Sequence, residues 1–455
     1  MRYLLLICLS IIFNLSQAQE TINSAQREIV FRSVNVIPMD QERVIANQDV
    51  VVKNGMITAI GNSGSVKYAG DALVIDGKGK YLMPGLAEMH AHVPPVNDIE
   101  PMKEVAQLFA VNGITTIRGM LGHPLHLELR SKINSGEIMG PRFITSGPSL
   151  NGNTVKTPQA AVDSVRSQKN AGYDFMKLHP GLTKENFAAI VAESRKLNHP
   201  FAGHVSFDVG VWRAIDGGYA TIDHLDGFVE SLVPGIENIK ESETGLFGMF
   251  IGSKADESKI PALVKGLKDH SIWVVPTQSL AERWMSPQRS VDELANAPEM
   301  VYMNKATVTA WTNNKKTLIA NPSYDPKSVN AFIQLRRKLI YECNKNGVGL
   351  LLGCDAPQVF NVPGFSTHHE LAYLVDAGLT PYEAIKTGTV NVGKFLKRDD
   401  LGTIKKGNVS DLVLLSDNPL TNIRNTQKIE GVMLGKLWLS KEYISGRLNA
   451  IKATK

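Results

Sequence analysis

The stretch Tyr81–His92 (YLMPGLAEMHAH) joins a strand-like apolar run to two histidines that are separated by a single residue. Side chains alternate between the two faces of a strand, so His90 and His92 project to the same side. Two imidazoles on one side of a strand can bind a single metal ion together. From residue 82 to residue 396, short apolar strands alternate with helical segments, a rhythm that is typical of a parallel sheet.

Eight segments have the pattern of buried strands, and eight is the number of strands in a closed (β/α)8 barrel. They are residues 81–90, 115–120, 142–147, 174–178, 200–205, 220–225, 272–278 and 348–355. The expected helices include residues 184–197 and 381–396, whose apolar side chains recur about every 3.6 positions. Long segments follow the sixth and seventh strands, and long loops in a compact fold are usually functional.

The two ends of the chain carry a different pattern from the middle. Short segments there alternate apolar and polar residues, and Asn54-Gly55 is a strong hairpin signal. We therefore predict an α/β fold in which a (β/α)8 TIM barrel occupies residues 82–400. Residues 19–81 and 401–455 are predicted to form a small β-sandwich domain together.

The composition is that of an ordinary globular protein. Of 455 residues, 43% are hydrophobic and 20% are charged, which excludes a disordered chain, a collagen or a small disulfide-stapled protein. The net charge is +5, and the basic residues do not cluster, whereas a nucleic-acid-binding protein normally carries a clustered basic face. We therefore expect no nucleic-acid partner. A homo-oligomer is compatible with the sequence.

Residues 1–18 have the layout of a secretory signal peptide. Arg2 precedes a short apolar run, Tyr3–Phe13, and small residues lead to Ala18. The apolar run is too short to cross a bilayer as a helix. We predict cleavage after Ala18 and an exported protein, periplasmic or secreted, without stable membrane insertion.

Cleavage would remove Cys8 and leave Cys343 and Cys354 in an oxidising compartment. The predicted strand that separates the two spans roughly 17 Å at about 3.3 Å per residue. A disulfide needs Cα atoms within about 7 Å of each other. We therefore predict two free, buried thiols.

Six side chains suited to metal chemistry stand at the carboxyl ends of the predicted strands, where barrel enzymes carry their active sites. They are His90, His92, Lys177, His204, His224 and Asp355. Each residue alone has an ordinary structural explanation, such as a core histidine or a solvated lysine. Their shared position at one end of the barrel instead predicts a metal site, since imidazole and carboxylate suit zinc and its first-row neighbours.

Several stretches carry a resemblance to a known family. PGLAEMHAHV (84–93) looks like an opening metal motif, GYDFMKL (172–178) like a strand with a metal-bridging lysine, and LLGCDAP (351–357) like an aspartate strand. FAGHVSFDVG (201–210) and TIDHLDG (221–227) look like single-histidine strands. With the C-terminal segment 368–420, these motifs resemble the metal-dependent amidohydrolase superfamily, most closely its exported prolidase-like and imidazolonepropionase-like members.

The resemblance implies a binuclear site with two divalent metal ions, zinc being the first expectation. It implies that His90, His92 and Asp355 hold a buried metal and that His204 and His224 hold an outer one. Lys177 would bridge the metals as a carbamate formed with carbon dioxide. The implied mechanism is attack by a metal-activated water, with Asp355 as general base and then general acid.

Deaminase branches of the superfamily typically place a glutamate three residues after the fifth-strand histidine, where this chain has Phe207. With Lys177, this departure favours hydrolysis of an amide or peptide bond, in a dipeptide or N-acyl amino acid. A lactonase, an esterase or a cyclic-amide hydrolase on the same metals is an alternative. An alternative of another class is a catalytically inactive protein that binds a metal or a ligand.

Three further residues are weaker candidates for contact with a small-molecule or short-peptide substrate. Arg118, at the end of the second strand, either pairs with a substrate carboxylate or forms a structural ion pair on the barrel rim. His179 lies two residues beyond Lys177 and either faces the cleft or belongs to a loop. His369, near the start of a helix after the eighth strand, either contacts substrate or caps that helix.

Overall fold

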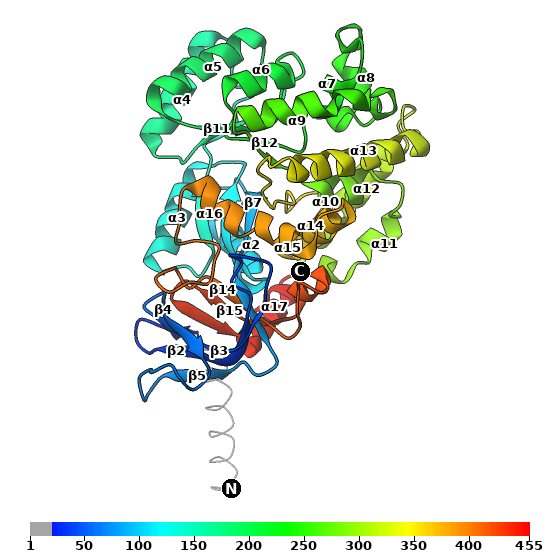
Figure 1. Ribbon diagram of the computed structural model, residues 1–455. Helices are drawn as coiled ribbons and strands as arrows, with labels where there is room; N and C mark the ends of the chain where they lie inside the picture. Colours follow the sequence, from blue (N-terminus) through cyan, green and yellow to red (C-terminus); the bar gives the residue numbers. More distant parts are fainter. Residues whose placement is uncertain (1–20) are drawn as a thin grey trace, which may run out of the picture.

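The computed structural model describes residues 21–455, so the predicted signal peptide and Cys8 lie outside the described residues. Figure 1 shows the barrel and its helices above a small β domain, in which N-terminal and C-terminal strands lie side by side. Among the described residues, no helix is both long enough and apolar enough to span a bilayer.

The barrel consists of parallel strands in two ladders. One ladder joins β7 (Leu86–Ala91), β8 (Ile114–Gly119) and β9 (Arg142–Thr145), and the other joins β10 (Met176–Leu178), β11 (Phe201–Gly203), β12 (Thr221–Asp223) and β13 (Trp273–Val275). Isolated bridges from Ser146 to Phe175 and from Leu150 to Leu178 connect the ladders. The predicted barrel class is therefore confirmed.

The eighth barrel segment, predicted as a strand over residues 348–355, differs from the other seven. It closes the barrel through single parallel bridges, Val274 to Leu350 and Ala91 to Ala356, and not through a continuous ladder. Gly353 explains how closely it approaches β7, because a Cβ atom there would lie 2.9 Å from the backbone nitrogen of His90. This close approach brings Asp355 beside the histidines of β7.

Helices surround the barrel, and most begin at a side-chain cap. In α5 (Lys184–Leu197), which has the predicted bounds, Thr183 accepts a hydrogen bond from the backbone of Asn186. The others that flank the strands are α2 (Ile99–Val111), α3 (Pro124–Ser135), α4 (Pro158–Ala171), α6 (Gly210–Gly217), α9 (Ile260–Asp269), α13 (Pro326–Lys345) and α14 (Phe365–Asp376).

The helix predicted over residues 381–396 is in fact two helices, α15 (Pro381–Thr387) and α16 (Val390–Leu396). The break occurs at Gly388 and Thr389, where the Thr389 backbone is not helical (φ −131°, ψ −93°). Glycine is a poor helix former, and the β-branched Thr389 that follows it adds to this weakness. The pattern of apolar residues continues across the break and therefore did not reveal it.

The long segments that follow the sixth and seventh strands are largely helical. After β12 the chain forms α7 (Phe228–Leu232), α8 (Glu241–Thr244) and short 3-10 turns. After β13 it forms α10 (Gln278–Leu280), the π-helical turn η5 (Ala281–Met285), α11 (Val291–Ala295) and α12 (Lys305–Ile319). These segments supply walls for the cavity described below.

The β domain is one nine-stranded sheet in which the three C-terminal strands lie next to one another, between N-terminal strands on either side. Its strands are β1 (Ile22–Asn23), β2 (Ile29–Val36), β3 (Ile45–Lys53), β4 (Met56–Asn62), β5 (Leu73–Asp76), β6 (Tyr81–Pro84), β14 (Leu412–Leu415), β15 (Ile429–Leu434) and β16 (Leu437–Ser440). Although three strands separate β2 from β16, the rings of Phe31 and Trp438 lie 5.2 Å apart. The sheet therefore curls over its own core, as the predicted sandwich requires.

The expected hairpin is present between β3 and β4. Asn54 and Gly55 both have positive φ angles, 50° and 77°, which is the geometry that favours Asn-Gly in a two-residue turn. Leu412 of β14 pairs with Pro84 of β6, and this pairing joins the C-terminal strands to the N-terminal ones. The C-terminal helix α17 (Lys441–Ala453) follows β16 directly.

Cys343 and Cys354 are both buried and unpaired, which confirms the prediction of free thiols. Cys343 lies on α13, and Cys354 donates its Sγ hydrogen to Glu88 Oε2 over 3.1 Å. We expect the denatured, unreduced mature protein to react with two equivalents of a thiol reagent per chain. An unchanged count after reduction is the control, and fewer than two thiols before reduction would contradict the structure.

Candidate metal centre

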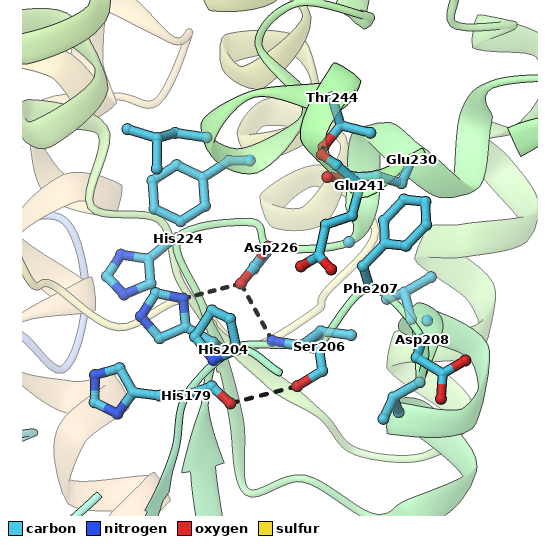
Figure 2. Close-up of a pocket in the computed structure, with 18 of the residues that line it drawn as sticks. His179, His204, Ser206, Phe207, Asp208, His224, Asp226, Glu230, Glu241 and Thr244 are labelled. Carbon is cyan, nitrogen blue, oxygen red and sulfur yellow. Dashed lines mark hydrogen bonds and ion pairs between the residues drawn. The ribbon is translucent and has the colours of Figure 1, made fainter. Parts of the chain in front are cut away.

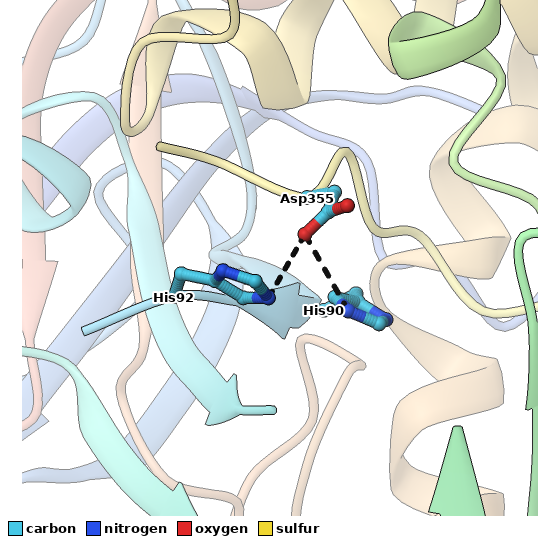
Figure 3. Close-up of side chains that lie close together, drawn as sticks. All are labelled: His90, His92 and Asp355. Carbon is cyan, nitrogen blue, oxygen red and sulfur yellow. Dashed lines mark ion pairs between the residues drawn. The ribbon is translucent and has the colours of Figure 1, made fainter. Parts of the chain in front are cut away.

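The structure brings the six predicted side chains together at the carboxyl end of the barrel. Three of them form a compact group, shown in Figure 3. Asp355 Oδ1 lies 3.0 Å from His92 Nε2 and 3.5 Å from His90 Nε2. One ligand atom from each of these residues lies within 4.8 Å of the other two. Because neither His92 Nε2 nor Asp355 Oδ1 has a hydrogen-bond partner outside this group among the described residues, the group fits a cation.

His204 and His224 form the second half of the site. Their rings lie 4.4 Å apart, and the ring of His224 also lies 4.4 Å from that of His90. The Nδ1 atom of His204 lies 2.9 Å from Asp226 Oδ2, and that of His224 lies 2.8 Å from Thr277 Oγ1. Both contacts leave the opposite nitrogen, Nε2, for a ligand, and among the described residues Nε2 of His224 is buried without a partner. Figure 2 shows His204, His224 and Asp226 at one side of the cavity.

Lys177 is fully buried between these groups, with Nζ 3.3 Å from His90 Nε2. Burial lowers the pKa of Lys177 to about 8. Near neutral pH, the neutral form of this amine is therefore far more populated than that of an exposed lysine. Burial likewise lowers the pKa of His92 to about 3 and holds the pKa values of His90, His204 and His224 well below their ordinary value. Neutral imidazole is the form that binds metals.

The sequence prediction did not include the carboxylates that orient the histidines. Asp223 Oδ2 lies 2.9 Å from His90 Nδ1, and Asp226 holds His204 as described above. Carboxylates of this kind fix the orientation of metal-binding histidines and raise their basicity. The sequence does contain a signal for these carboxylates, because Asp223 and Asp226 belong to the stretch TIDHLDG that carries His224.

Arg118 does not lie at the cavity, although it was a candidate for substrate contact. Its side chain is 2% exposed, and Nε donates to the carbonyl of Met89 over 2.7 Å. Nη2 donates to Thr221 Oγ1 over 3.0 Å and lies 3.5 Å from Asp223 Oδ1. Arg118 therefore forms a structural ion pair, as one of the two predicted alternatives had it, but in the barrel interior and not on the rim.

The two candidate histidines differ in position. His179 lines the cavity, stacks on His204 with ring centroids 5.0 Å apart, and shares a 2.7 Å hydrogen bond with Ser149 Oγ. His369 instead lies 3.0 Å from Glu299 Oε1 and is not among the residues that line the cavity. It does not cap α14 either, because the N-cap residue is Gly364. Of the weaker candidates, His179 is the one placed to meet a substrate.

A cavity of about 840 Å³ opens over the site. Its walls combine the metal-binding groups with apolar side chains, such as Leu246, Phe247 and Trp284, and with carboxylates, including Glu230 and Glu241. Pockets for small molecules have volumes of about 300–1,000 Å³, so this cavity accommodates a compound of dipeptide size. Phe207, at the position where a deaminase would carry glutamate, also lines it.

Gly203 precedes His204 and has a φ of +121°, a conformation that strains any other residue. A Cβ atom there would lie 2.5 Å from the carbonyl oxygen of Leu178 and 2.7 Å from Lys177 Cδ. We expect Gly203→Ala to lower the free energy of unfolding by about 1–3 kcal/mol and to reduce metal content, since Lys177 must move. Denaturant unfolding and metal analysis measure the two effects.

Gly172→Ala is the matched control for this prediction. Gly172 also has a positive φ, +86°, but a Cβ atom added there would meet nothing within 4 Å beyond its chain neighbours. We expect Gly172→Ala to keep its full metal content. Equal loss of metal in both variants would contradict the steric explanation.

The comparison with known proteins gives a family. The model of the amidohydrolase family matches residues 81–447. The chain belongs to the amidohydrolase family. It is accordingly a hydrolase that acts on carbon–nitrogen bonds, and the resemblance inferred from the motifs is confirmed. Members of this family are metal-dependent, which agrees with the clustered ligands.

Individual relatives of this amidohydrolase are distant. Ochratoxinase of Aspergillus niger is 22% identical over 87% of this chain and 83% of its own length. Bottromycin amidohydrolase has a TM-score of 0.69, with 20% identity over 94% of this chain and 92% of its own. The structure of an Xaa-Pro dipeptidase with bound methionine has a TM-score of 0.66, with 19% identity over 91% of this chain and 100% of its own length. These likenesses extend over the barrel and the β domain.

Proposed function

We propose that this amidohydrolase cleaves the amide bond of a dipeptide or an N-acyl amino acid at a centre for two metal ions, zinc by expectation. One observation carries the proposal: six side chains suited to metal binding cluster together, several with unpartnered ligand atoms among the described residues, and four of the six (His92, His204, His224 and Asp355) line a cavity of about 840 Å³. The family assignment leaves the substrate class open, and the choice of a dipeptide agrees with the Xaa-Pro dipeptidase among the structures that this chain resembles.

In the proposed centre, His90, His92 and Asp355 would hold the inner ion, and His204 and His224 would hold the outer ion. Lys177 would contribute to holding both ions as a carbamate, and its burial beside His90 Nε2 supports this role. When bound, such ions polarise the scissile carbonyl and lower the pKa of a water molecule.

The chain's own residues orient the substrate and move the proton. Asp355 lines the cavity, and its carboxylate takes the proton of the attacking water and delivers it to the leaving nitrogen. His179, held by Ser149, is placed beside His204 to contact the substrate. Apolar side chains such as Phe247 and Trp284 exclude water from the reacting bond.

The test is metal analysis of the purified mature protein together with a panel of dipeptides, N-acyl amino acids, lactones and esters. We expect two metal ions per chain, turnover of amides, and loss of turnover on chelation that zinc restores. Turnover of lactones or esters without amides would establish the alternative substrate class. Full activity in the metal-free protein, or tight binding without any turnover, would refute the proposal.

We also propose that the protein is exported. The basis is the sequence of residues 1–18, with Arg2, the apolar run and Ala18 at the cleavage position. N-terminal sequencing of protein recovered outside the cytoplasm should begin at Gln19. Recovery of the whole of the protein from the cytoplasm, with Met1 or Arg2 still at its start, would refute export.

A further inference from the structure

Arg336 lies on α13, behind the half of the site that contains His204 and His224. Its side chain is buried, with 1% of the residue exposed, and its guanidinium donates to three oxygens. Nη1 donates to the carbonyl of His224 over 2.6 Å, and Nη2 to that of Pro276 over 2.7 Å. Nε donates to Gln278 Oε1 over 3.0 Å. One rigid group therefore joins the ends of β12 and β13.

The backbone that Arg336 holds is strained. His224 has a φ of +64°, Leu225 of +55° and Thr277 of +46°, a region that residues other than glycine rarely occupy. Such conformations persist only where the surrounding structure holds them. At the end of β12, the guanidinium supplies this restraint through a bond to the carbonyl of the metal-binding residue itself.

The same two strand ends also fix the imidazole of His224. Thr277 Oγ1 lies 2.8 Å from Nδ1 of His224, so the opposite nitrogen faces the other histidines. Phe247 packs on the imidazole face, with centroids 5.1 Å apart, and lies 5.9 Å from the Arg336 guanidinium carbon. Moving the end of β13 relative to the end of β12 would therefore turn the ring.

We propose that Arg336 is a positioning residue for the outer metal ion, because it locks the two strand ends that orient His224. The inference rests on the proposed function and names a determinant of that same site. Arginine is required, since its planar fork reaches oxygens in several directions at once, whereas a lysine ammonium is a single point.

Arg336→Met and Arg336→Lys test the proposal, with Lys315→Met as a matched control. Lys315 is also a fully buried cation that binds carbonyls, those of Arg283 over 2.8 Å and Ser286 over 3.0 Å, but no metal-binding residue. We expect Arg336→Met to weaken binding of one of the two metal ions about 10–100-fold, as loss of an orienting group does. Arg336→Lys should show a smaller loss of affinity for that metal ion. Lys315→Met should bind both metal ions as tightly as the parent protein.

A second measurement does not depend on the metal count. In crystals of the metal-free variants, we expect the His224 imidazole to turn away from Thr277 in Arg336→Met and Arg336→Lys, and to stay in Lys315→Met. An unmoved His224, or equal effects of Arg336→Met and Lys315→Met, would overturn the role of Arg336. If the parent protein binds fewer than two ions, the binuclear centre fails, yet the His224 orientation still decides the role of Arg336.

Discussion

Replacing Asp355 with asparagine is expected to lower kcat by about 10²–10⁴-fold, the range that general acid–base catalysis supplies. Asparagine has nearly the same shape and keeps an oxygen that can face the metal, but it cannot accept the proton of water. The carboxylate lies 3.0 Å from His92 Nε2, so its loss acts at the centre of the site. Steady-state kinetics on the best substrate of the panel measure the effect.

Asp417→Asn is the control, because Asp417 lies in the β domain, where it pairs with Lys428 at 3.3 Å. It should turn over substrate like the parent protein. Asp355→Asn could lose activity because it lacks the proton acceptor or because it no longer holds a metal ion. Metal analysis of the variant distinguishes these two causes. A protein that only binds its ligand would hold it in both variants much as before, and such a result would contradict the catalytic role of Asp355.

Replacing Lys177 with alanine is expected to reduce the metal content from two ions per chain to one. Its buried side chain is the proposed bridge, with Nζ 3.3 Å from His90 Nε2. We expect kcat/KM to fall by at least about 10²-fold, comparable to the loss of one preorganised electrostatic group. Metal analysis and kinetics check both expectations.

Two observations distinguish a carbamate from a plain lysine in the same position. The intact parent protein should carry the mass of one added carboxyl group, which mild acid removes. A short carboxylate such as acetate should restore part of the activity of Lys177→Ala, since it can supply the missing bridging oxygens. Two tightly bound ions in Lys177→Ala would contradict the bridge.

The part of the site that sequence could predict follows from strand geometry. Alternation along a strand places His90 and His92 on one side, and parallel strands place their carboxyl ends at one rim. Lys177, His204, His224 and Asp355 were therefore predictable from position alone. The same reasoning predicted the barrel and the β domain built from both chain ends, because both depend on local patterns of apolar residues.

The remaining contacts depend on packing between distant segments. Arg118 lies one residue before the end of β8, so its position in the sequence is compatible with either the rim or the interior of the barrel. Its hydrogen bond to Thr221 shows that the side chain lies in the interior. His369 likewise pairs with Glu299, which lies in a distant 3-10 helix, η6 (Pro298–Tyr302). The hydrogen bond from Arg336 to the carbonyl of His224 joins residues 112 positions apart in the chain, and no short-range pattern encodes it.

The curled sheet of the β domain has a consequence for synthesis. β6 pairs on one side with β2 and on the other with β14, which is translated only after the whole barrel. The early strands thus leave the ribosome with one edge unpaired, and sequence-distant pairings of this kind slow folding. An exposed edge of that type recruits other chains. Premature termination before Leu412 would consequently yield aggregating fragments instead of a shorter enzyme.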